Sequence, residues 1–419
     1  KRPGGKTEER RAVVVDFQNP DNNHFLAIKE LKIHGDLYRR RTDIVGFVNG
    51  IPLLFVELKK NTVDVQDAYT NNYTDYLDTI PQLFYYNAFL MISNGVEAKV
   101  GTLGSKYEFF HEWKRLNEQE QGNVALETML RGICKKENFL DLLENFILFD
   151  HSGGHTAKIL ARNHQYLGVN EAVKAYEARK LNDGKLGVFW HTQGSGKSLS
   201  MVFYAHLLQE VLHSPTIVVM IDRIDLDDQL YAQFCKCADF LHQTPVQAES
   251  KEHLKALLAG REANGIIFTT LFKFEKGEKP LSERRNIVVM ADEAHRGQYG
   301  FDERIVMSED ADGNKEARVV VGNARVLHDA LPNATFIGFT GTPVSVKDRN
   351  TREVFGDYID IYDMTQAVED GSTRPVYYES RVIHLKLDQN TLRLIDATYD
   401  ALEQMSDSAT IEKSKKMLG

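Results

Sequence analysis

The chain has 419 residues, of which 42% are hydrophobic and 26% charged, and its formal net charge is −9. This length exceeds what one ordinary hydrophobic core supports, so two or three domains are expected, and the composition is typical of a globular protein. The net acidity argues against a surface that binds nucleic acid everywhere, but it is compatible with a local basic channel.

The sequence gives no indication of a membrane-spanning segment or of a secretory signal. No apolar run approaches the roughly 20 residues that a membrane span needs, and the charged segment KRPGGKTEERR (1–11) has no apolar stretch behind it. We therefore expect no membrane partner and no secretory signal. Three cysteines, Cys134, Cys235 and Cys237, indicate unpaired thiols in a reducing compartment, so the expected location is cytoplasmic.

Runs rich in β-branched and aromatic residues fill the first 110 residues and predict strands. They are RAVVVDF (11–17), DIVGFVN (43–49), IPLLFVELKK (51–60) and NAFLMISNG (87–95). From about residue 112 the spacing of apolar residues becomes helical, as in ENFLDLLENFILFD (137–150), and HSGGH (151–155) then interrupts it. We predict a first, mixed α/β domain over residues 1–150.

Acidic residues and a lysine stand at the outer ends of two of these runs, in the order Asp43, Glu57, Lys59. Glu57 and Lys59 are two residues apart on a strand, so their side chains project from the same face. Two carboxylates could hold Mg²⁺, which polarises a phosphodiester and lowers the pKa of a bound water, and Lys59 could stabilise the developing charge. Taken alone, the pattern is better explained by a strand leaving the core.

The Asn49-Gly50 pair between the two runs predicts a hairpin turn whose length decides the register. A two-residue loop pairs Val48 with Ile51 and turns Glu57 away from the face of Asp43. The two carboxylates share a face only if the register changes, and we expect a three-residue connection with Gly50 as a left-handed bulge. The basic clusters nearby, Arg39–Arg41 and Lys59–Lys60, are by themselves typical of solvated charge runs.

Beyond residue 151, short apolar runs alternate with longer helical segments, which predicts a parallel sheet with helices on both faces. The runs are LGVFW (186–190), TIVVMI (216–221), GIIFTT (265–270), NIVVMA (286–291) and TFIGFT (335–340). This second α/β domain is predicted over residues 151–370.

The stretch FWHTQGSGKSLSM (189–201) follows one of these runs and opens a helical segment. Glycines there let backbone N–H groups approach a phosphate, Lys197 can reach the outer phosphates of ATP, and Ser198 can offer its hydroxyl to Mg²⁺. His191 stands where the general pattern has its first glycine. The predicted nucleotide-binding residues are Thr192, Gln193, Gly194, Ser195, Gly196, Lys197 and Ser198.

A second motif, DEAH (292–295), closes the run NIVVMA. An acid at the tip of a strand near the phosphate loop can hold Mg²⁺, which fits Asp292, and Glu293 is then placed to polarise an attacking water. His295 completes the predicted nucleotide site.

With these motifs the chain resembles the superfamily 2 helicases and translocases. FTGTPV (339–344) resembles their motif III, and RNHQYLGV (162–169) resembles their adenine-reading segment. The resemblance implies that Thr340, Gly341 and Thr342 couple the ATP state to motion, and that Gln165 reads the base. It also implies ATP and Mg²⁺ as cofactors.

The order of all these stretches resembles the restriction (R) subunit of type I restriction-modification enzymes. The resemblance implies a PD-(D/E)xK nuclease, with Asp43, Glu57 and Lys59 catalytic, followed by a RecA-like motor domain. It implies ATP-dependent translocation of double-stranded DNA coupled to Mg²⁺-dependent cleavage of unmodified DNA, with methyltransferase (M) and specificity (S) subunits as partners. In this family a Q-x-x-x-Y element follows the lysine, and Gln66 is the predicted counterpart of its glutamine.

Residues 371–419 are too few for a second RecA-like domain, so we interpret them as a linker or the start of such a domain and expect ATP binding without translocation. Two other interpretations remain. The chain could be a stand-alone helicase-nuclease of another defence or repair system. It could also be a nucleotide-binding docking fragment whose nuclease is silent.

Overall fold

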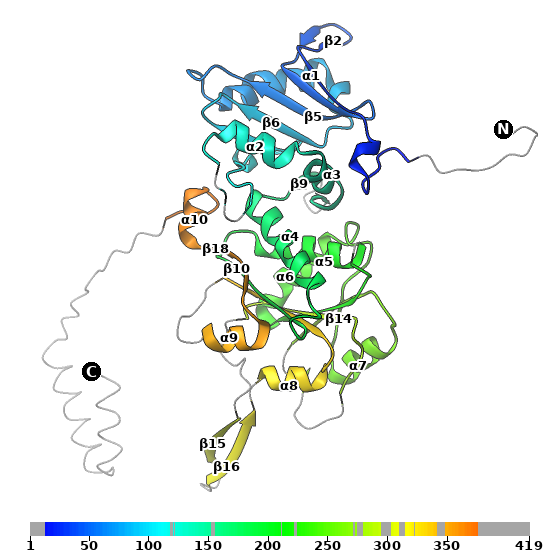
Figure 1. Ribbon diagram of the computed structural model, residues 1–419, viewed down its shortest axis with the longest axis vertical. Coiled ribbons are helices and arrows are strands. Elements are labelled where there is room, and N and C mark those ends of the chain that lie inside the picture. The colour runs from blue at the N-terminus through cyan, green and yellow to red at the C-terminus, as the bar shows by residue number, and fades with distance from the viewer. Residues whose placement is uncertain are drawn as a thin grey trace, which may run out of the picture. The chain divides into compact units, whose positions relative to one another are not determined.

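The computed structural model describes residues 13–117, 120, 122–151, 156–210, 212–221, 224–270, 273–274, 280–294, 303–309, 315–321, 323–341 and 348–375. The chain divides into two units, Lys1–Thr373 and Arg374–Gly419, and the helices and strands below lie in the first unit (Figure 1). Among the described helices, none is long and apolar enough to cross a bilayer.

A five-stranded sheet carries the first candidate site. Its strands are β1 (Phe25–Lys29), β4 (Ile44–Val48), β5 (Ile51–Leu58), β6 (Phe89–Ser93) and β7 (Ala98–Gly101), in the order β1-β4-β5-β6-β7. Strands β5 and β6 are parallel and the other neighbours are antiparallel. Three of the four runs that predict strands in this region are therefore confirmed as β4, β5 and β6. The run RAVVVDF (11–17) is not, because its described residues 13–17 form no strand.

Helical segments and small ribbons surround this sheet. The helical segments are η1 (Pro20–Asn22), the π-helix η2 (Ala68–Tyr73), α1 (Thr74–Thr79), η3 (Pro81–Phe84), η4 (Tyr107–Phe109), α2 (Ala125–Ile133) and α3 (Lys136–Asn145). The ribbons pair β2 (Lys32–His34) with β3 (Arg39–Arg41), and β8 (Ile147–Asp150) with β9 (Ala157–Leu160). The helical expectation for residues 112–150 is confirmed only over α2 and α3. The described residues between 112 and 124 form no helix, and residues 147–150 pair as a strand instead.

The second sheet has seven parallel strands in the order β12-β13-β11-β14-β17-β10-β18 (Figure 1). They are β10 (Lys185–His191), β11 (Thr216–Ile221), β12 (Val246–Gln247), β13 (Ile266–Thr270), β14 (Ile287–Ala291), β17 (Thr335–Thr340) and β18 (Tyr358–Tyr362). All five apolar runs beyond residue 151 are confirmed as strands. This is the RecA-like α/β architecture that the sequence predicts.

Helices alternate with these strands along the chain, as parallel connections require. They are α4 (Asn163–Glu177), α5 (Lys197–Glu210), α6 (Ile224–Lys236), α7 (Lys251–Ala259), α8 (Asn323–Ala330), α9 (Asp348–Phe355) and α10 (Met364–Glu369). An antiparallel ribbon of β15 (Glu303–Glu309) and β16 (Lys315–Val321) is inserted before α8. Every residue of α5 from Ser200 to Gln209 is buried, so this helix runs through the core.

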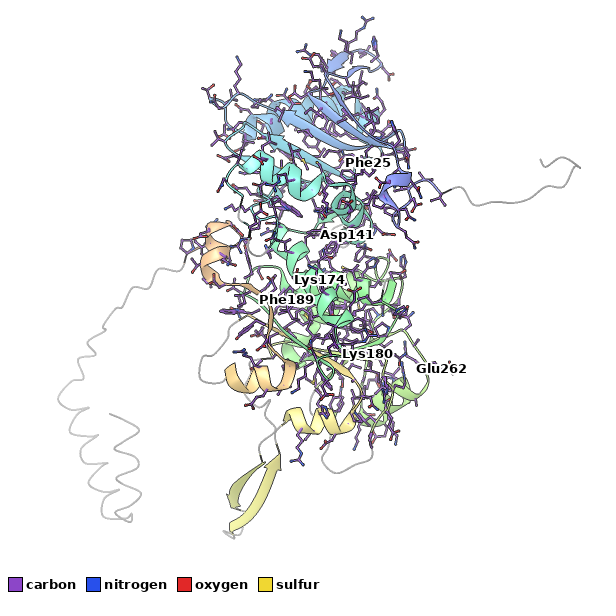
Figure 2. All side chains as sticks on the ribbon, in the orientation of Figure 1. Phe25, Asp141, Lys174, Lys180, Phe189 and Glu262 are labelled. Carbon is purple, nitrogen blue, oxygen red and sulfur yellow. The ribbon has the colours of Figure 1, made fainter. Side chains whose placement is uncertain are left out.

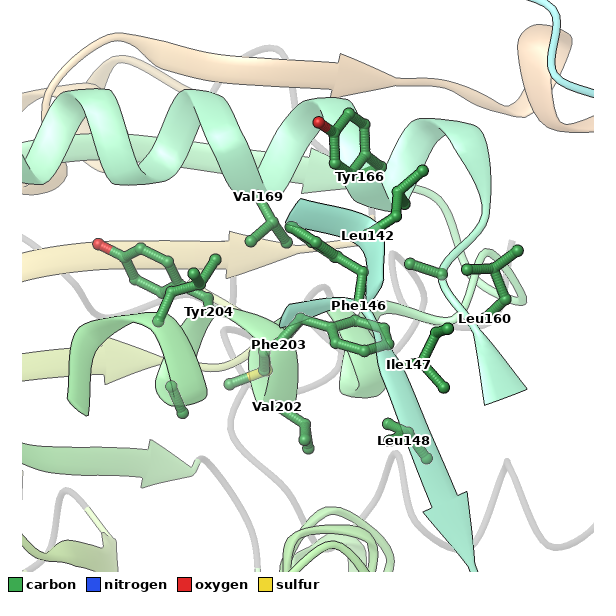
Figure 3. Close-up of a cluster of buried hydrophobic side chains, with 14 of the residues drawn as sticks. Leu142, Phe146, Ile147, Leu148, Leu160, Tyr166, Val169, Val202, Phe203 and Tyr204 are labelled. Carbon is green, nitrogen blue, oxygen red and sulfur yellow. The ribbon is translucent and has the colours of Figure 1, made fainter. Parts of the chain in front are cut away.

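A single hydrophobic core runs across residue 150, the predicted domain limit. Phe146, which follows α3, packs its ring at 4.8 Å from Tyr166 of α4 and at 5.5 Å from Phe203 of α5 (Figure 3). Asp141 of α3, labelled in Figure 2, accepts a hydrogen bond from Asn170 of α4 at 3.4 Å, and burial raises the pKa of its carboxyl group. The limits 1–150, 151–370 and 371–419 remain a prediction.

Candidate functional site

The β4–β5 hairpin turns through two residues, Asn49 and Gly50, whose φ angles are 51° and 84°. Positive φ at both positions is the mark of a type I′ turn, which matches the twist of the flanking strands. Val48 therefore pairs with Ile51. The expected three-residue connection is wrong.

A bulge within β5 nevertheless changes the register. Phe47 pairs with Pro52, but Gly46 pairs with Leu54, so Leu53 is the extra residue and Ile44 then pairs with Val56. The next position along the ladder places Asp43 opposite Glu57, and opposite residues of an antiparallel pair share a face. The shared face that the sequence analysis required is reached through a bulge in the strand.

Hydrogen bonds fix the three polar side chains at this strand end. The Asp43 carboxylate accepts from the backbone N–H of Leu58 at 2.7 Å. The Lys59 ammonium donates to Glu57 Oε1 at 3.2 Å and to Asn72 Oδ1 at 2.5 Å. The two acids and the lysine therefore lie together, and Asn72 of η2 adds a fourth polar group.

Glu57 is the most deeply buried member of this group, with 2% of its surface exposed. Its Oε2 atom has no hydrogen-bond partner among the described residues. The pKa of Glu57 is raised to about 7, first by burial and then by the neighbouring Asp43, while Lys59 lowers it. A buried carboxylate with an unpaired oxygen is an arrangement that a bound cation relieves.

Gln66, the fourth predicted nuclease residue, is exposed. Its hydrogen bonds to described residues use its backbone: its N–H donates to Asp64 and its carbonyl accepts from Thr70. Asn72 instead reaches Lys59, and Tyr76, four residues later, donates its hydroxyl to the Arg41 carbonyl at 3.1 Å. Asn72 and Tyr76 thus have the spacing of the Q-x-x-x-Y element, with Asn in place of Gln, and this was the signal that the sequence analysis missed.

The second candidate site lies where β10 ends and α5 begins. Gly194 and Gly196 have φ angles of 82° and 86°, which residues with a side chain rarely adopt. A Cβ atom on Gly196 would lie 2.7 Å from Gln165 Nε2, so the backbone needs glycine at this place. Ser195 is buried and its hydroxyl donates to the Thr192 carbonyl at 2.7 Å. The loop is therefore held in a shape that leaves its backbone accessible to a phosphate.

Lys197 opens α5 and lies between the two acids that follow β14. Its ammonium is 3.2 Å from Asp292 Oδ1 and 3.1 Å from Glu293 Oε1. Glu293 has a φ of 48°, a strained angle that is often found at functional sites. Strand β17 lies between β14 and β10, so the carboxyl ends of three adjacent strands meet here, where α/β proteins bind ligands.

Two side chains of α4 bind the back of the loop. Gln165 donates to the Gly196 carbonyl at 3.0 Å and accepts from the Arg162 N–H at 2.9 Å, and the His164 ring bonds the Ser195 carbonyl at 2.8 Å. A cavity of about 440 Å³ lies alongside, lined by Gln165 and Gly194 to Gly196 and, from the first sheet's side, by the segment from Gly101 to His111.

His191, in the position of the missing glycine, serves a structural purpose. Its buried ring donates through Nε2 to Asp360 of β18 at 2.5 Å. Burial, and then the charge of Lys197, lower the pKa of His191 to about 3, so the ring is neutral. The contact of His164 with the loop and that of His191 with β18 were not predicted. Both depend on the burial of the imidazole rings, which the sequence does not reveal.

The other predicted nucleotide residues surround the loop. Thr192 is buried and donates its backbone N–H to Tyr362, Gln193 is exposed, and Ser198 is the second residue of α5. Thr340 ends β17, and a Cβ atom on Gly341 would touch Gln193. His295 and Thr342 lie outside the described residues.

The carboxylates at the two sites are candidate ligands for Mg²⁺. Across the described ranges, no group of three or more His, Cys, Asp and Glu side chains could hold a metal ion. Mg²⁺ needs fewer protein ligands, because it is usually held by one or two carboxylates and keeps several waters, and the neighbouring Asp43 and Glu57 fit such a site.

Two family models match the chain: the type I restriction enzyme R protein N terminus over residues 1–109, and the SWI2/SNF2 ATPase over residues 164–412. The chain is 42% identical to the endonuclease subunit of the type I restriction enzyme HindI of Haemophilus influenzae, covering 97% of this chain and 39% of that protein. It is 33% identical to a Methanocaldococcus jannaschii protein assigned as the MjaIXP endonuclease subunit, covering 99% and 40%. The chain thus spans about two fifths of the length of these relatives.

Among solved structures, a fragment assigned to the HsdR subunit of a type I restriction enzyme from Vibrio vulnificus matches with 15% identity and a TM-score of 0.32, covering 82% of this chain and 56% of that one. The ATPase family model covers more than half of the chain, and the R protein model covers its first 109 residues. The chain therefore belongs to the SWI2/SNF2 ATPase family, and its first 109 residues are similar to the N terminus of type I restriction enzyme R proteins.

Proposed function

We propose that the chain is the nuclease and first motor region of a type I restriction endonuclease subunit. In this proposal Asp43, Glu57 and Lys59 cleave unmodified double-stranded DNA with Mg²⁺, and the loop at residues 192–198 binds ATP. Hydrolysis of ATP drives movement along DNA in the full-length protein, together with the M and S subunits in the cytoplasm. The relatives' names support the restriction role.

The observation that carries the proposal is the register of the β4–β5 hairpin. The bulge at Leu53 puts Asp43 opposite Glu57, at the cost of burying Glu57 with an unpaired oxygen. A stability-driven sequence would not retain this arrangement, since an unsatisfied buried carboxylate is unfavourable. The requirement for a cation between the two acids explains it.

Each residue of the nuclease site then has a defined task. Asp43 is oriented by the Leu58 N–H, and Glu57 presents its unpaired oxygen to the metal. Lys59 is held by Glu57 and Asn72 with its ammonium ready to stabilise the negative charge that develops on the attacked phosphate. Bound Mg²⁺ would polarise the phosphodiester and supply an activated water.

At the ATP site, Lys197 would exchange its contacts with Asp292 and Glu293 for the phosphates. Asp292 is then free to hold Mg²⁺ with Ser198, and Glu293 to accept a proton from the attacking water. Gln165 lies at the cavity beside the loop, which supports a role in holding the base there, with Thr340 to Thr342 and His295 linking the site to movement.

The nuclease assignment is tested with the full-length subunit assembled with M and S subunits. Lys59→Ala should lower the rate of Mg²⁺-dependent cutting of unmodified plasmid by at least about 100-fold, because a charge-stabilising group is lost. Lys60→Ala, a change of the exposed neighbour, should cut as the wild type does. Equal cutting by Lys59→Ala would contradict the assignment, and a wild type that never cuts would favour the silent docking fragment.

The ATP assignment is tested by nucleotide affinity in the 419-residue chain. Lys197→Ala should weaken the binding of a fluorescent ATP analogue by at least about 10-fold, since a charge-assisted contact to phosphate is lost. Lys180→Ala removes an exposed lysine elsewhere and should leave the affinity unchanged. Unchanged affinity in Lys197→Ala would refute the phosphate-loop role.

A further inference from the structure

The β2–β3 ribbon has one face that carries only basic and imidazole side chains. Lys32 pairs with Arg41 and His34 with Arg39, and directly opposite residues of an antiparallel pair project from the same face. All four side chains are exposed. Like charges directly opposite each other destabilise a ribbon, and the exposed Glu30, 3.7 Å from Arg41, offsets little of this repulsion.

The other face of the ribbon is bound firmly to the body of the protein. Ile33 packs against the core beneath the five-stranded sheet, and Arg40 binds both carboxylate oxygens of Asp75 in α1, at 2.7 Å and 2.9 Å. Gln82 donates to the His34 carbonyl, and a Cβ atom on Gly35 would collide with the Thr79 carbonyl. The basic face is therefore presented on a fixed support.

This support is continuous with the candidate nuclease site. Arg41 is separated from Asp43 only by the buried Thr42, and its carbonyl accepts the hydroxyl of Tyr76. Tyr76 lies one turn beyond Asn72, which holds Lys59. The segment that positions the basic face thus also positions the catalytic group, and Figure 1 shows β2 on a projection next to α1, beyond the sheet that carries β5.

The tip of the ribbon carries two exposed apolar side chains beside the exposed Asp36. Leu37 and Tyr38 are 87% and 51% exposed, and Gly35 closes the turn by donating to the Tyr38 carbonyl. A narrow two-stranded ribbon with cations on one face fits into the groove of a DNA duplex, and exposed apolar side chains at its tip can contact sugars and base edges there.

We propose that Lys32, His34, Arg39 and Arg41 form a phosphate-binding face that seats duplex DNA over the Asp43–Glu57–Lys59 site. The proposal rests on the proposed nuclease function and adds to it the surface that holds the substrate. The charge complementarity of this face with a phosphodiester backbone, on a chain whose net charge is −9, selects duplex DNA as the partner.

The test compares two triple variants of the 419-residue chain that lose the same charge. Lys32→Ala/Arg39→Ala/Arg41→Ala removes cations of the ribbon face, and Arg131→Ala/Lys135→Ala/Lys174→Ala removes exposed cations of α2, α4 and the residue before α3. Affinity for a short labelled duplex is measured in Ca²⁺, which replaces Mg²⁺ so that binding is read without cleavage.

The ribbon variant should bind at least about 10-fold more weakly, and its slope of log affinity against log salt should be shallower by about 2 to 3. The control variant should keep the wild-type affinity and slope. The melting temperature of the ribbon variant should not fall, because the variant removes a repulsive pair. Equal DNA binding by the ribbon variant, or an equal loss in the control, would overturn the proposal.

The outcomes also separate this proposal from the nuclease assignment. If the wild type does not cut but the ribbon variant still loses DNA affinity, the nuclease assignment fails and the DNA-binding face stands. If cutting depends on Lys59 but the DNA affinity of the ribbon variant equals that of the wild type, only the ribbon proposal fails. Unchanged DNA affinity with weakened assembly with the M and S subunits would make the ribbon a protein-docking surface, which also overturns it.

Discussion

Glu57 is the residue whose burial is hardest to explain without a ligand. It is the last buried residue of β5, in which Leu53 to Glu57 are all buried, and its Oε2 atom has no partner among the described residues. Replacing it with an apolar residue of similar size would be expected to stabilise the strand. The presence of Glu57 therefore indicates a functional requirement. The same burial raises its pKa to about 7, so its titration can be followed near neutral pH.

The raised pKa of Glu57 predicts how stability depends on pH in the metal-free protein. Because the folded-state pKa of about 7 lies above the ordinary value of 4.5, the folded state holds the proton more tightly. The free energy of unfolding should fall as pH rises from about 4.5 to about 7, by on the order of 3 kcal/mol. Glu57→Gln should lack this loss, so it should be more stable than the wild type at pH 8 but not at pH 4.

The measurement is urea unfolding in the presence of a chelator, across this pH range. Glu108→Gln, a change of an exposed glutamate, should follow the wild-type curve. Parallel curves for wild type and Glu57→Gln would show that the Glu57 carboxyl is not desolvated as the structure indicates.

The hairpin that carries Glu57 shows which structural features the local sequence can predict and which it cannot. Asn49 and Gly50 predict their turn because a type I′ turn needs positive φ at both positions, and these residues tolerate it. Leu53 gives no such signal. Its carbonyl instead accepts from the Ala88 N–H at 2.7 Å and from the Asn87 side chain at 3.3 Å, so contacts remote in sequence set the bulge.

The helical segment after Lys59 is a second feature that the local sequence does not reveal. Residues Ala68–Tyr73 form a π-helix, which changes the phase at which side chains face the sheet. Counting from the lysine therefore favoured Gln66, while the structure turns Asn72 toward Lys59. The phosphate loop is easier to locate from the sequence, because Gly194, Gly196 and Lys197 lie within four consecutive residues and the two glycines have positive φ.

The support of the bulge by Asn87 can be tested. Asn87→Ala should lower the free energy of unfolding by about 1–2 kcal/mol, the usual cost of losing a buried hydrogen bond. It should also slow DNA cutting in the assembled full-length enzyme, because the register that joins Asp43 to Glu57 loses its support. Nucleotide affinity should not change, since the ATP loop lies on the other sheet.

Asn138→Ala provides the matched control. Its side chain also donates to a backbone carbonyl, that of Gly132 at 2.8 Å, but it lies away from the hairpin. This variant should lose similar stability and keep its cutting rate. A normal cutting rate in Asn87→Ala would show that the register does not depend on this amide.

Continuity of the core across residue 150 makes the two sheets parts of one packed body within the first unit. Phe146 is fully buried and touches Tyr166 and Phe203, whereas Phe149, three residues later, is 47% exposed. Under the proposed function, such packing would connect a change in α4 and α5 directly to α3 and the five-stranded sheet. The two glycines from which the domain boundary was predicted could not indicate this continuous core. Glycines indicate local backbone flexibility, whereas the core depends on packing between residues distant in sequence.

Phe146→Ala should therefore destabilise both sheets at once. We expect a loss of about 3–5 kcal/mol, the usual cost of truncating a buried phenylalanine, while Phe149→Ala should cost far less because its ring is already half in solvent. Hydrogen exchange followed by mass spectrometry would report protection in β5 and in α5 separately. Protection should fall in both elements for Phe146→Ala and in neither for Phe149→Ala. If only the segment around residue 146 lost protection, the two sheets would be independent domains, and coupling between ATP and the nuclease would have to run through another part of the protein.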